Sequence, residues 1–156
     1  MSATPFGFTP EEIDTAAPTR QARLKWVVVV DASLPAGRAT NAAVCVAAAT
    51  GAAVTGLLGP DATDADGTVH PGLPWAGCTV LGATPEQLAA VRQKAGASDG
   101  VLVVDMPAAA QHTRVYDEYL AEVARRTGPD LGYLAVGVVG PRNRVDRVVG
   151  RLPLLA

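Results

Sequence analysis

Two aspartates that each follow a valine-rich run are the first residues whose types and positions suggest chemistry. Asp31 follows the run 27–30, and Asp105 follows the run 100–104. If the two runs form neighbouring strands, the carboxylates lie at one edge of a sheet, where close carboxylates drive their pKa values apart and serve as acid and base. The other interpretation is that each aspartate caps the turn or helix that follows it, a common role of this residue.

His70 is the third catalytic candidate, because it lies in a long segment, 59–77, rich in glycine, proline and aspartate. Long irregular segments in small domains are often functional, and a histidine carries protons near neutral pH. The alternative is a histidine that is solvated or braces the loop. No other histidine or cysteine lies at metal-ligand spacing, so the sequence predicts neither a metal site nor a cofactor. The predicted catalytic set is Asp105, Asp31 and His70.

A second group of candidates surrounds the start of an alanine-rich helix predicted over 37–50. Gly37 and Arg38 lie in its first turn, where free N–H groups and the helix dipole favour an anion and the guanidinium adds a bidentate donor. Asn41 can reach either a substrate or a neighbouring loop carbonyl. No G-x-S-x-G motif marks Ser33 as a nucleophile. The predicted substrate-binding residues are Ser33, Gly37, Arg38, Asn41, Gly72 and Tyr116.

Four arginines near the end of the chain form its main basic cluster: Arg142, Arg144, Arg147 and Arg151. Such a cluster either contacts phosphate or is simply a solvated face. The net charge of −2 favours the solvated face. Dedicated nucleic-acid-binding proteins are usually basic, so this net charge gives no indication of such a protein.

Valine-rich runs that alternate with helical patterns must position these side chains. The capping box from Thr84 to Gln87 is the clearest helix start, and Thr9-Pro10-Glu11-Glu12 also has the pattern of the start of a short helix. The alternation predicts a three-layer α/β/α domain with a small mixed, mostly parallel sheet over residues 25–156, preceded by an N-terminal extension, 1–24. Strands are predicted at 25–30, 54–58, 78–81, 100–105, 131–139 and 151–155, and helices at 37–50, 84–98, 111–127 and 142–149.

The composition, with 49% apolar and 18% charged residues, is that of a folded protein. No apolar run approaches the roughly 18 residues of a membrane span, and a signal-peptide pattern is lacking, so we expect a cytoplasmic protein with no membrane partner. The apolar surroundings of Cys45 and Cys78 predict buried thiols. The excess of arginine over lysine, together with abundant alanine, is typical of a GC-rich bacterial genome.

Both ends of the predicted domain resemble the second, archaeal and eukaryotic, class of peptidyl-tRNA hydrolases. The resemblance implies the fold of that class, a hydrolytic activity and a homodimer. At the opening end it rests on Leu34, Gly37, Arg38 in place of a lysine, Ala42, Ala43 and Cys45. At the closing end it rests on Gly140-Pro141, Val145-Asp146, Val149-Gly150, Leu152, Leu154 and Leu155.

The polar residues of those hydrolases are only partly present. Val44 and Ala47 stand where the hydrolases have a glutamine and a histidine, and the motif around Asp105 lacks its threonine. Peptidyl-tRNA cleavage is therefore not favoured, although tRNA is a possible partner. The middle of the chain is more similar to a family of uncharacterised bacterial proteins sharing that fold, through Asp66-Gly67-x-x-His70-Pro71-Gly72 and Tyr116-Asp117-x-Tyr119.

Two functions are compatible with these residues. The first is a small hydrolase or acyl-transfer enzyme acting on an ester or amide, such as an aminoacyl or peptidyl conjugate, in a cleft where strand 25–30 meets helix 37–50. The second is a non-catalytic module that binds a small molecule or a protein and retains the fold without the hydrolase chemistry. Convergence of the polar residues in one pocket would favour the enzyme, and their dispersal would favour the module.

Overall fold

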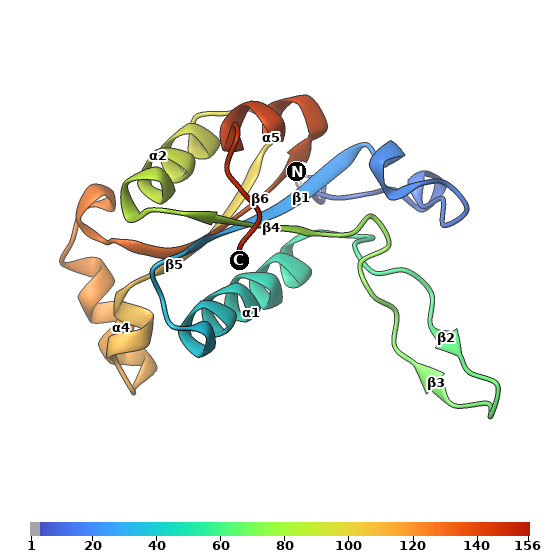
Figure 1. The fold of residues 1–156 in the computed structure, drawn as a ribbon, viewed down its shortest axis with the longest axis horizontal. Coiled ribbons are helices and arrows are strands. Elements are labelled where there is room, and N and C mark those ends of the chain that lie inside the picture. Colours follow the sequence, from blue (N-terminus) through green and yellow to red (C-terminus); the bar gives the residue numbers. More distant parts are fainter. Residues whose placement is uncertain (1–3) are drawn as a thin grey trace.

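A four-stranded mixed sheet forms the centre of the computed structural model, which describes residues 4–156 (Figure 1). Its strands lie in the order β4 (Thr79–Ala83), β1 (Leu24–Asp31), β6 (Tyr133–Pro141) and β5 (Leu102–Pro107). β1 is parallel to β4, and β6 is antiparallel to both β1 and β5. The carboxyl ends of β1, β4 and β5 therefore share one edge of the sheet.

The sheet is mixed, as predicted, but parallel pairing does not predominate in it. Among the strands that the structure describes, only β1 and β4 form a parallel pair in this sheet. Continuous apolar runs are typical of parallel strands because helices cover both faces of such sheets. β6 reaches the same burial while running antiparallel to its neighbours, since seven of its nine residues are buried. A continuous apolar run therefore indicates that both faces of a strand are covered, but it does not indicate whether the strand is parallel to its neighbours.

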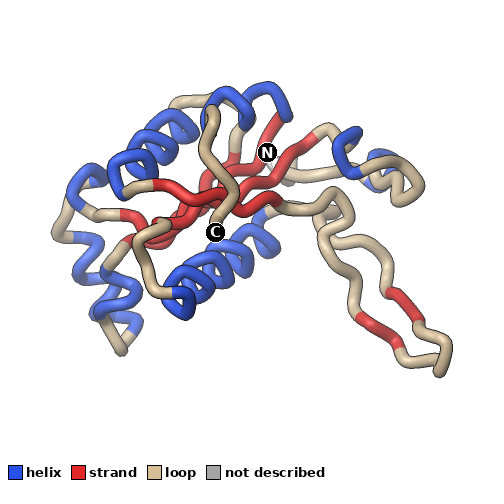
Figure 2. The backbone as a smooth tube through the Cα atoms, in the orientation of Figure 1, coloured by secondary structure: helices blue, strands red, loops and turns tan. Residues whose placement is uncertain are grey.

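Three helices cover the two faces of the sheet: α1 (Ala36–Ala53) on one face, and α2 (Pro85–Gly96) and α5 (Arg142–Val149) on the other (Figures 1 and 2). α1 packs against β1, β5 and β6, whereas α2 and α5 pack against β6 and against each other. No helix of residues 4–156 is both long and apolar enough to cross a membrane.

Successive valines of β1 divide between the two cores. Val28 and Val30 belong to the cluster under α1, and Val27 and Val29 belong to the cluster under α2 and α5. None of the four is more than 2% exposed. The prediction that residues 27–30 form a strand buried on both faces is therefore confirmed.

The predicted helix start at Thr84 is also confirmed. The Thr84 hydroxyl oxygen accepts a hydrogen bond from the Gln87 amide (3.2 Å), and the Gln87 side-chain oxygen accepts one from the Thr84 amide (2.9 Å). Pro85 occupies the first helical position, where its missing N–H costs nothing. α2 therefore begins directly after β4.

The single helix predicted over 111–127 is two helices, α3 (Ala109–His112) and α4 (Tyr116–Ala124). Thr113 ends α3 with extended backbone, and both its amide and its hydroxyl donate to the Ala109 carbonyl. The β-branched Thr113 and Val115 disfavour helix at the break. After the break, α4 buries none of its residues.

Two other predicted strands are not strands in the described structure. Residues 54–58 turn at Gly56 (φ +66°), and Val54 and Leu57 are buried beneath the turn. Residues 151–155 run along β4 but form only an isolated bridge between Leu81 and Leu154. Pro153 lacks an N–H group and cannot extend the ladder.

Residues 58–75 project from the body of the molecule, and we call this segment the arm (Figures 1 and 2). It contains two short antiparallel strands, β2 (Ala62–Thr63) and β3 (Val69–His70). The Asp64 carboxylate accepts hydrogen bonds from the amides of Asp66 (3.0 Å) and Thr68 (2.9 Å) and so closes the tip. The arm is thus held together by its own polar contacts.

The described part of the predicted extension, residues 4–23, packs against the base of the arm. The Phe8 ring is buried with its centroid 4.9 Å from that of Trp75. The segment contains two 3₁₀ helices, η1 (Pro10–Glu12) and η2 (Thr19–Gln21). η1 lies at the helix start predicted from Thr9 and Pro10, and the Glu12 carboxylate accepts a hydrogen bond from the Thr9 amide (2.9 Å).

Candidate functional site

The structure distributes the predicted site residues over three places. One is the end of β1, one is the side of α1 that faces α3 and α4, and one is the arm. His70 and Gly72, on the arm, do not line the groove that contains Asn41, Asp105 and Tyr116. The three groups are Asp31 with Ser33; Gly37, Arg38, Asn41, Asp105 and Tyr116; and His70 with Gly72.

A groove between α1 and α4 is the largest feature that brings predicted residues together. Its volume is about 640 Å³, within the range of small-molecule sites. The rings of Tyr116 and Tyr119 lie 5.3 Å apart at 57° on its α4 side. Its lining residues are Asn41, Cys45, Val46, Ala48, Ala49, Asp105, Met106, Ala110, Thr113, Arg114, Val115, Tyr116 and Tyr119.

Hydrogen bonds through Gln111 join the start of α1 to α3 at one end of this groove. The Arg38 Nε atom donates to Gln111 Oε1 (2.7 Å), and Gln111 Nε2 donates to the Arg38 carbonyl (3.0 Å) and to Asn41 Oδ1 (3.1 Å). The Gln111 side chain therefore links Arg38 and Asn41 within the protein. Sequence reasoning missed Gln111, whose one signal is a polar residue directly after three alanines.

Asp105 is the partner of Arg92 on α2. Arg92 Nε lies 2.5 Å from Asp105 Oδ2, and the two side chains are 35% and 20% exposed. Burial, and after it the Asp105 carboxylate, raises the pKa of Tyr133. The Asp105 side chain, which also lines the groove, therefore has Arg92 and Tyr133 as its charged and polar neighbours. Arg92 was not predicted, because a single arginine on an amphipathic helix has the pattern of a surface residue.

Asp31 is buried and forms a turn with Ser33. Asp31 Oδ1 accepts hydrogen bonds from the Ser33 amide (2.9 Å) and from the Ser33 hydroxyl (2.6 Å). β6 lies between β1 and β5, so the strands that carry Asp31 and Asp105 are not neighbours. Each carboxylate has its own partner, and the geometry agrees with the turn-capping interpretation for Asp31.

His70 and Gly72 support the arm. The His70 ring, 59% exposed, places Nε2 3.1 Å from Asp64 Oδ2. The Thr68 amide and then His70 lower the pKa of Asp64. The Gly72 amide donates to Asp61 Oδ1 (2.8 Å), and a Cβ atom at Gly72 would lie 1.9 Å from the Gly59 carbonyl oxygen. The contacts of His70 and Gly72 within the arm therefore account for both residues as structural ones, with no ligand needed.

The prediction that both cysteines are buried is wrong. Cys45 and Cys78 are exposed, and Cys45 lines the groove. α1 buries only one stripe against the sheet, so its outer side, including Val44 at 59% exposure, faces solvent. Small apolar residues occur on both sides of α1, which hides its amphipathic character. No group of three or more His, Cys, Asp or Glu residues that could hold a metal ion occurs within residues 4–156.

Comparisons with known proteins give a family and a fold. A family model described as "Protein of unknown function (DUF2000)" matches residues 24–156, beginning at the first residue of β1. A solved structure of Atu0240, a protein of unknown function from Agrobacterium tumefaciens, has a TM-score of 0.80 at 16% identity and covers 86% of this chain and 98% of that chain.

A comparison with curated proteins found no match. The prediction of an uncharacterised family is thus supported, while the peptidyl-tRNA hydrolase-like arrangement, the homodimer and the bacterial source stay predictions. The match spans most of the chain and includes every strand of the central sheet. The chain belongs to the DUF2000 family of proteins of unknown function.

Proposed function

We propose that this protein is a non-catalytic binding module whose ligand occupies the groove between α1 and α4. The observation that carries the proposal is the groove itself, which is about 640 Å³ in volume and combines an aromatic pair with a few polar groups. Ligand sites in proteins are typically concave and mostly apolar, with a small number of polar groups that set orientation.

The lining indicates the chemistry of the ligand. Tyr116 and Tyr119 offer aromatic surface, and Met106 offers an adaptable apolar contact. Arg114 lines the groove and forms no ion pair with any residue of the described chain, whereas Asp105 is already paired with Arg92. The ligand that fits these groups is a small molecule with an apolar body and one acidic group.

The dispersal of the predicted catalytic residues supports the module over the enzyme. A general base must lie within hydrogen-bond reach of the group that it activates. Asp105 is held by Arg92, Asp31 is held by Ser33, and His70 lies on the arm beside Asp64. The alternative is a small hydrolase or acyl-transfer enzyme that acts at the junction of β1 and α1. The experiment must distinguish this enzyme from the binding module.

Ligand-induced stabilisation tests the proposal with two matched variants on α1. Ala49→Trp fills the groove, whereas Val44→Trp adds the same ring outside the groove on an exposed position of the same helix. Small carboxylic acids with different apolar parts, from octanoate to indole-3-acetate, are screened by thermal unfolding. A ligand at ten times its Kd adds about 1.4 kcal/mol, or roughly 3–6 °C in a domain of this size.

We expect an acid that raises the melting temperature of the wild type and of Val44→Trp but not of Ala49→Trp. The amide of the same acid should bind more weakly, and Arg114→Gln should remove that difference. A screen without any stabilising acid, or one whose effect survives Ala49→Trp, would refute the binding groove. Turnover of nitrophenyl esters that disappears in Asp105→Asn would replace the module with the enzyme.

A further inference from the structure

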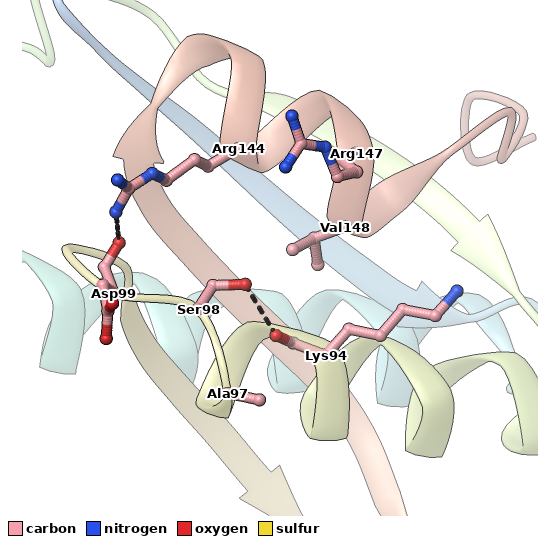
Figure 3. Close-up of a pocket in the computed structure, with 7 residues that line it drawn as sticks. All are labelled: Lys94, Ala97, Ser98, Asp99, Arg144, Arg147 and Val148. Carbon is pink, nitrogen blue, oxygen red and sulfur yellow. Dashed lines mark hydrogen bonds between the residues drawn. The ribbon is translucent and has the colours of Figure 1, made fainter.

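A second cavity lies on the opposite face of the sheet, between the end of α2 and α5, and we call it the basic cavity. Its volume is about 610 Å³. Arg144 and Arg147 of α5 lie on one side and Lys94 of α2 on the other, with Val148 between them (Figure 3). None of its lining residues belongs to the groove, so the two cavities are separate.

None of its three cationic side chains forms an ion pair within residues 4–156, and two of them have no side-chain partner at all. Lys94 Nζ and the Arg147 guanidinium form no ion pair or side-chain hydrogen bond with any residue of 4–156, while Arg144 donates to the Asp99 carbonyl (Figure 3). Asp146, beside Arg147 in the sequence, is engaged by Lys25 at 2.5 Å. Asp99 is the one carboxylate among the lining residues. The cavity therefore has an excess of positive charge in a chain whose net charge is negative.

The end of α2 does not cancel this excess. The carbonyl oxygens at a helix C-terminus carry partial negative charge, which repels anions when they are free. Here the Ser98 hydroxyl donates to the Lys94 carbonyl (2.8 Å), and the amides of Ala97 and Ser98 donate to the carbonyls of Gln93 and Ala95. The carbonyls of Gln93, Lys94 and Ala95 are thus satisfied within the protein.

We propose that the basic cavity binds the phosphate group of a small phosphorylated molecule. An arginine fork and a lysine ammonium are the side chains that bind phosphate best, through bidentate and point-charge contacts respectively. The size and the apolar parts of the lining, Ala97 and Val148, suit a small molecule. A nucleic acid would need a longer basic track than these residues provide.

Calorimetric titration with inorganic phosphate, with ADP and with a single-stranded RNA of 20 nucleotides tests this proposal. The test variant is Lys94→Gln/Arg147→Gln. The control is Arg125→Gln, which removes a cation directly after α4 and outside the basic cavity. The expected result is ADP binding that weakens at least about tenfold in the test variant and not in the control. Inorganic phosphate should bind the wild type more weakly than ADP does, and it should not bind Lys94→Gln/Arg147→Gln.

The absence of phosphate and ADP binding at millimolar concentration would overturn the proposal, and so would equal ADP affinity in the test variant and the control. RNA binding tighter than ADP binding, lost in the same variant, would overturn it in favour of a nucleic-acid surface. Melting temperatures establish that the variants fold. Retained ADP binding in Ala49→Trp is expected, because that change fills only the groove, and loss of binding there would contradict the independence of the two sites.

Discussion

Gly137→Ala is expected to destabilise the protein because Gly137 lies where α1 crosses β6. A Cβ atom at this position would lie 2.6 Å from Val46 Cγ1, well inside van der Waals contact. Val46 is 1% exposed and lines the floor of the groove, so it has little room to move. Forcing a methyl group into a packed core costs about 1–3 kcal/mol. In a domain of this size that cost lowers the melting temperature by roughly 2–12 °C.

Three further variants separate this clash from other effects of an added methyl group. Gly51→Ala, in the same α1, has nothing within 4 Å of its new Cβ and is expected to stabilise by about 0.4–1 kcal/mol. Val46→Ala alone should cost about 2 kcal/mol through lost burial and a cavity. In the double variant Gly137→Ala/Val46→Ala the new methyl group occupies that cavity. Its cost should therefore be smaller than the sum of the single costs by about 1 kcal/mol.

Urea unfolding of the wild type and the four variants, followed by circular dichroism, measures these differences. Unchanged slopes of free energy against urea concentration will show that the variants alter stability and not the compactness of the unfolded chain. Gly137→Ala as stable as the wild type would refute the close approach of α1 to β6. Fully additive costs in the double variant would show that the two side chains do not compete for one space.

Two other predictions concern pH and the arm. The guanidinium of Arg23 lowers the pKa of Glu12 from 4.5 to about 2, so the ion pair stabilises the fold above pH 4.5 and this contribution is lost as the pH falls towards 2. At pH 7, Glu12→Gln should therefore be less stable than the wild type by up to about 1 kcal/mol, a small value because the pair is exposed. Near pH 2 the two proteins should be equally stable. A stability difference between the two proteins that stays the same from pH 7 to pH 2 would contradict this. Gly72→Ala forces the new methyl group against the Gly59 carbonyl and should make the arm a protease-sensitive segment while the central sheet stays folded. Limited proteolysis with mass spectrometry measures this, with Gly51→Ala, whose new Cβ meets nothing within 4 Å, as comparison. Equal cleavage of wild type and Gly72→Ala would contradict it.

Predictions that depend on a few adjacent residues are correct. The capping box at Thr84 and the 3₁₀ helix after Thr9 form through contacts three residues apart. The buried strand 27–30 is also correct, because four consecutive valines have no favourable place except between two covering layers. These elements need no knowledge of where the rest of the chain lies.

Predictions that depend on burial in a particular neighbourhood are less successful. Cys45 and Val44 have apolar neighbours in sequence but lie on the outer side of α1. The helix predicted over 111–127 breaks at Thr113, where local β-branched residues and the end of β5 act together. In alanine-rich and valine-rich stretches the two sides of a helix or strand differ little in hydrophobicity. Their sequence therefore does not predict which side packs against the core.

The sequence by itself determined the alternation of strands and helices, the turn after Asp31 and the presence of cations near the end of the chain. Only the tertiary structure decided that β6 separates Asp31 from Asp105, that Gln111 joins Arg38 to Asn41, and that Lys94 meets Arg147 in a cavity. The physical reason is the separation along the chain of the residues that interact. Capping and periodicity act over a few residues, whereas strand order and the pairing of charges depend on contacts between segments far apart in the sequence.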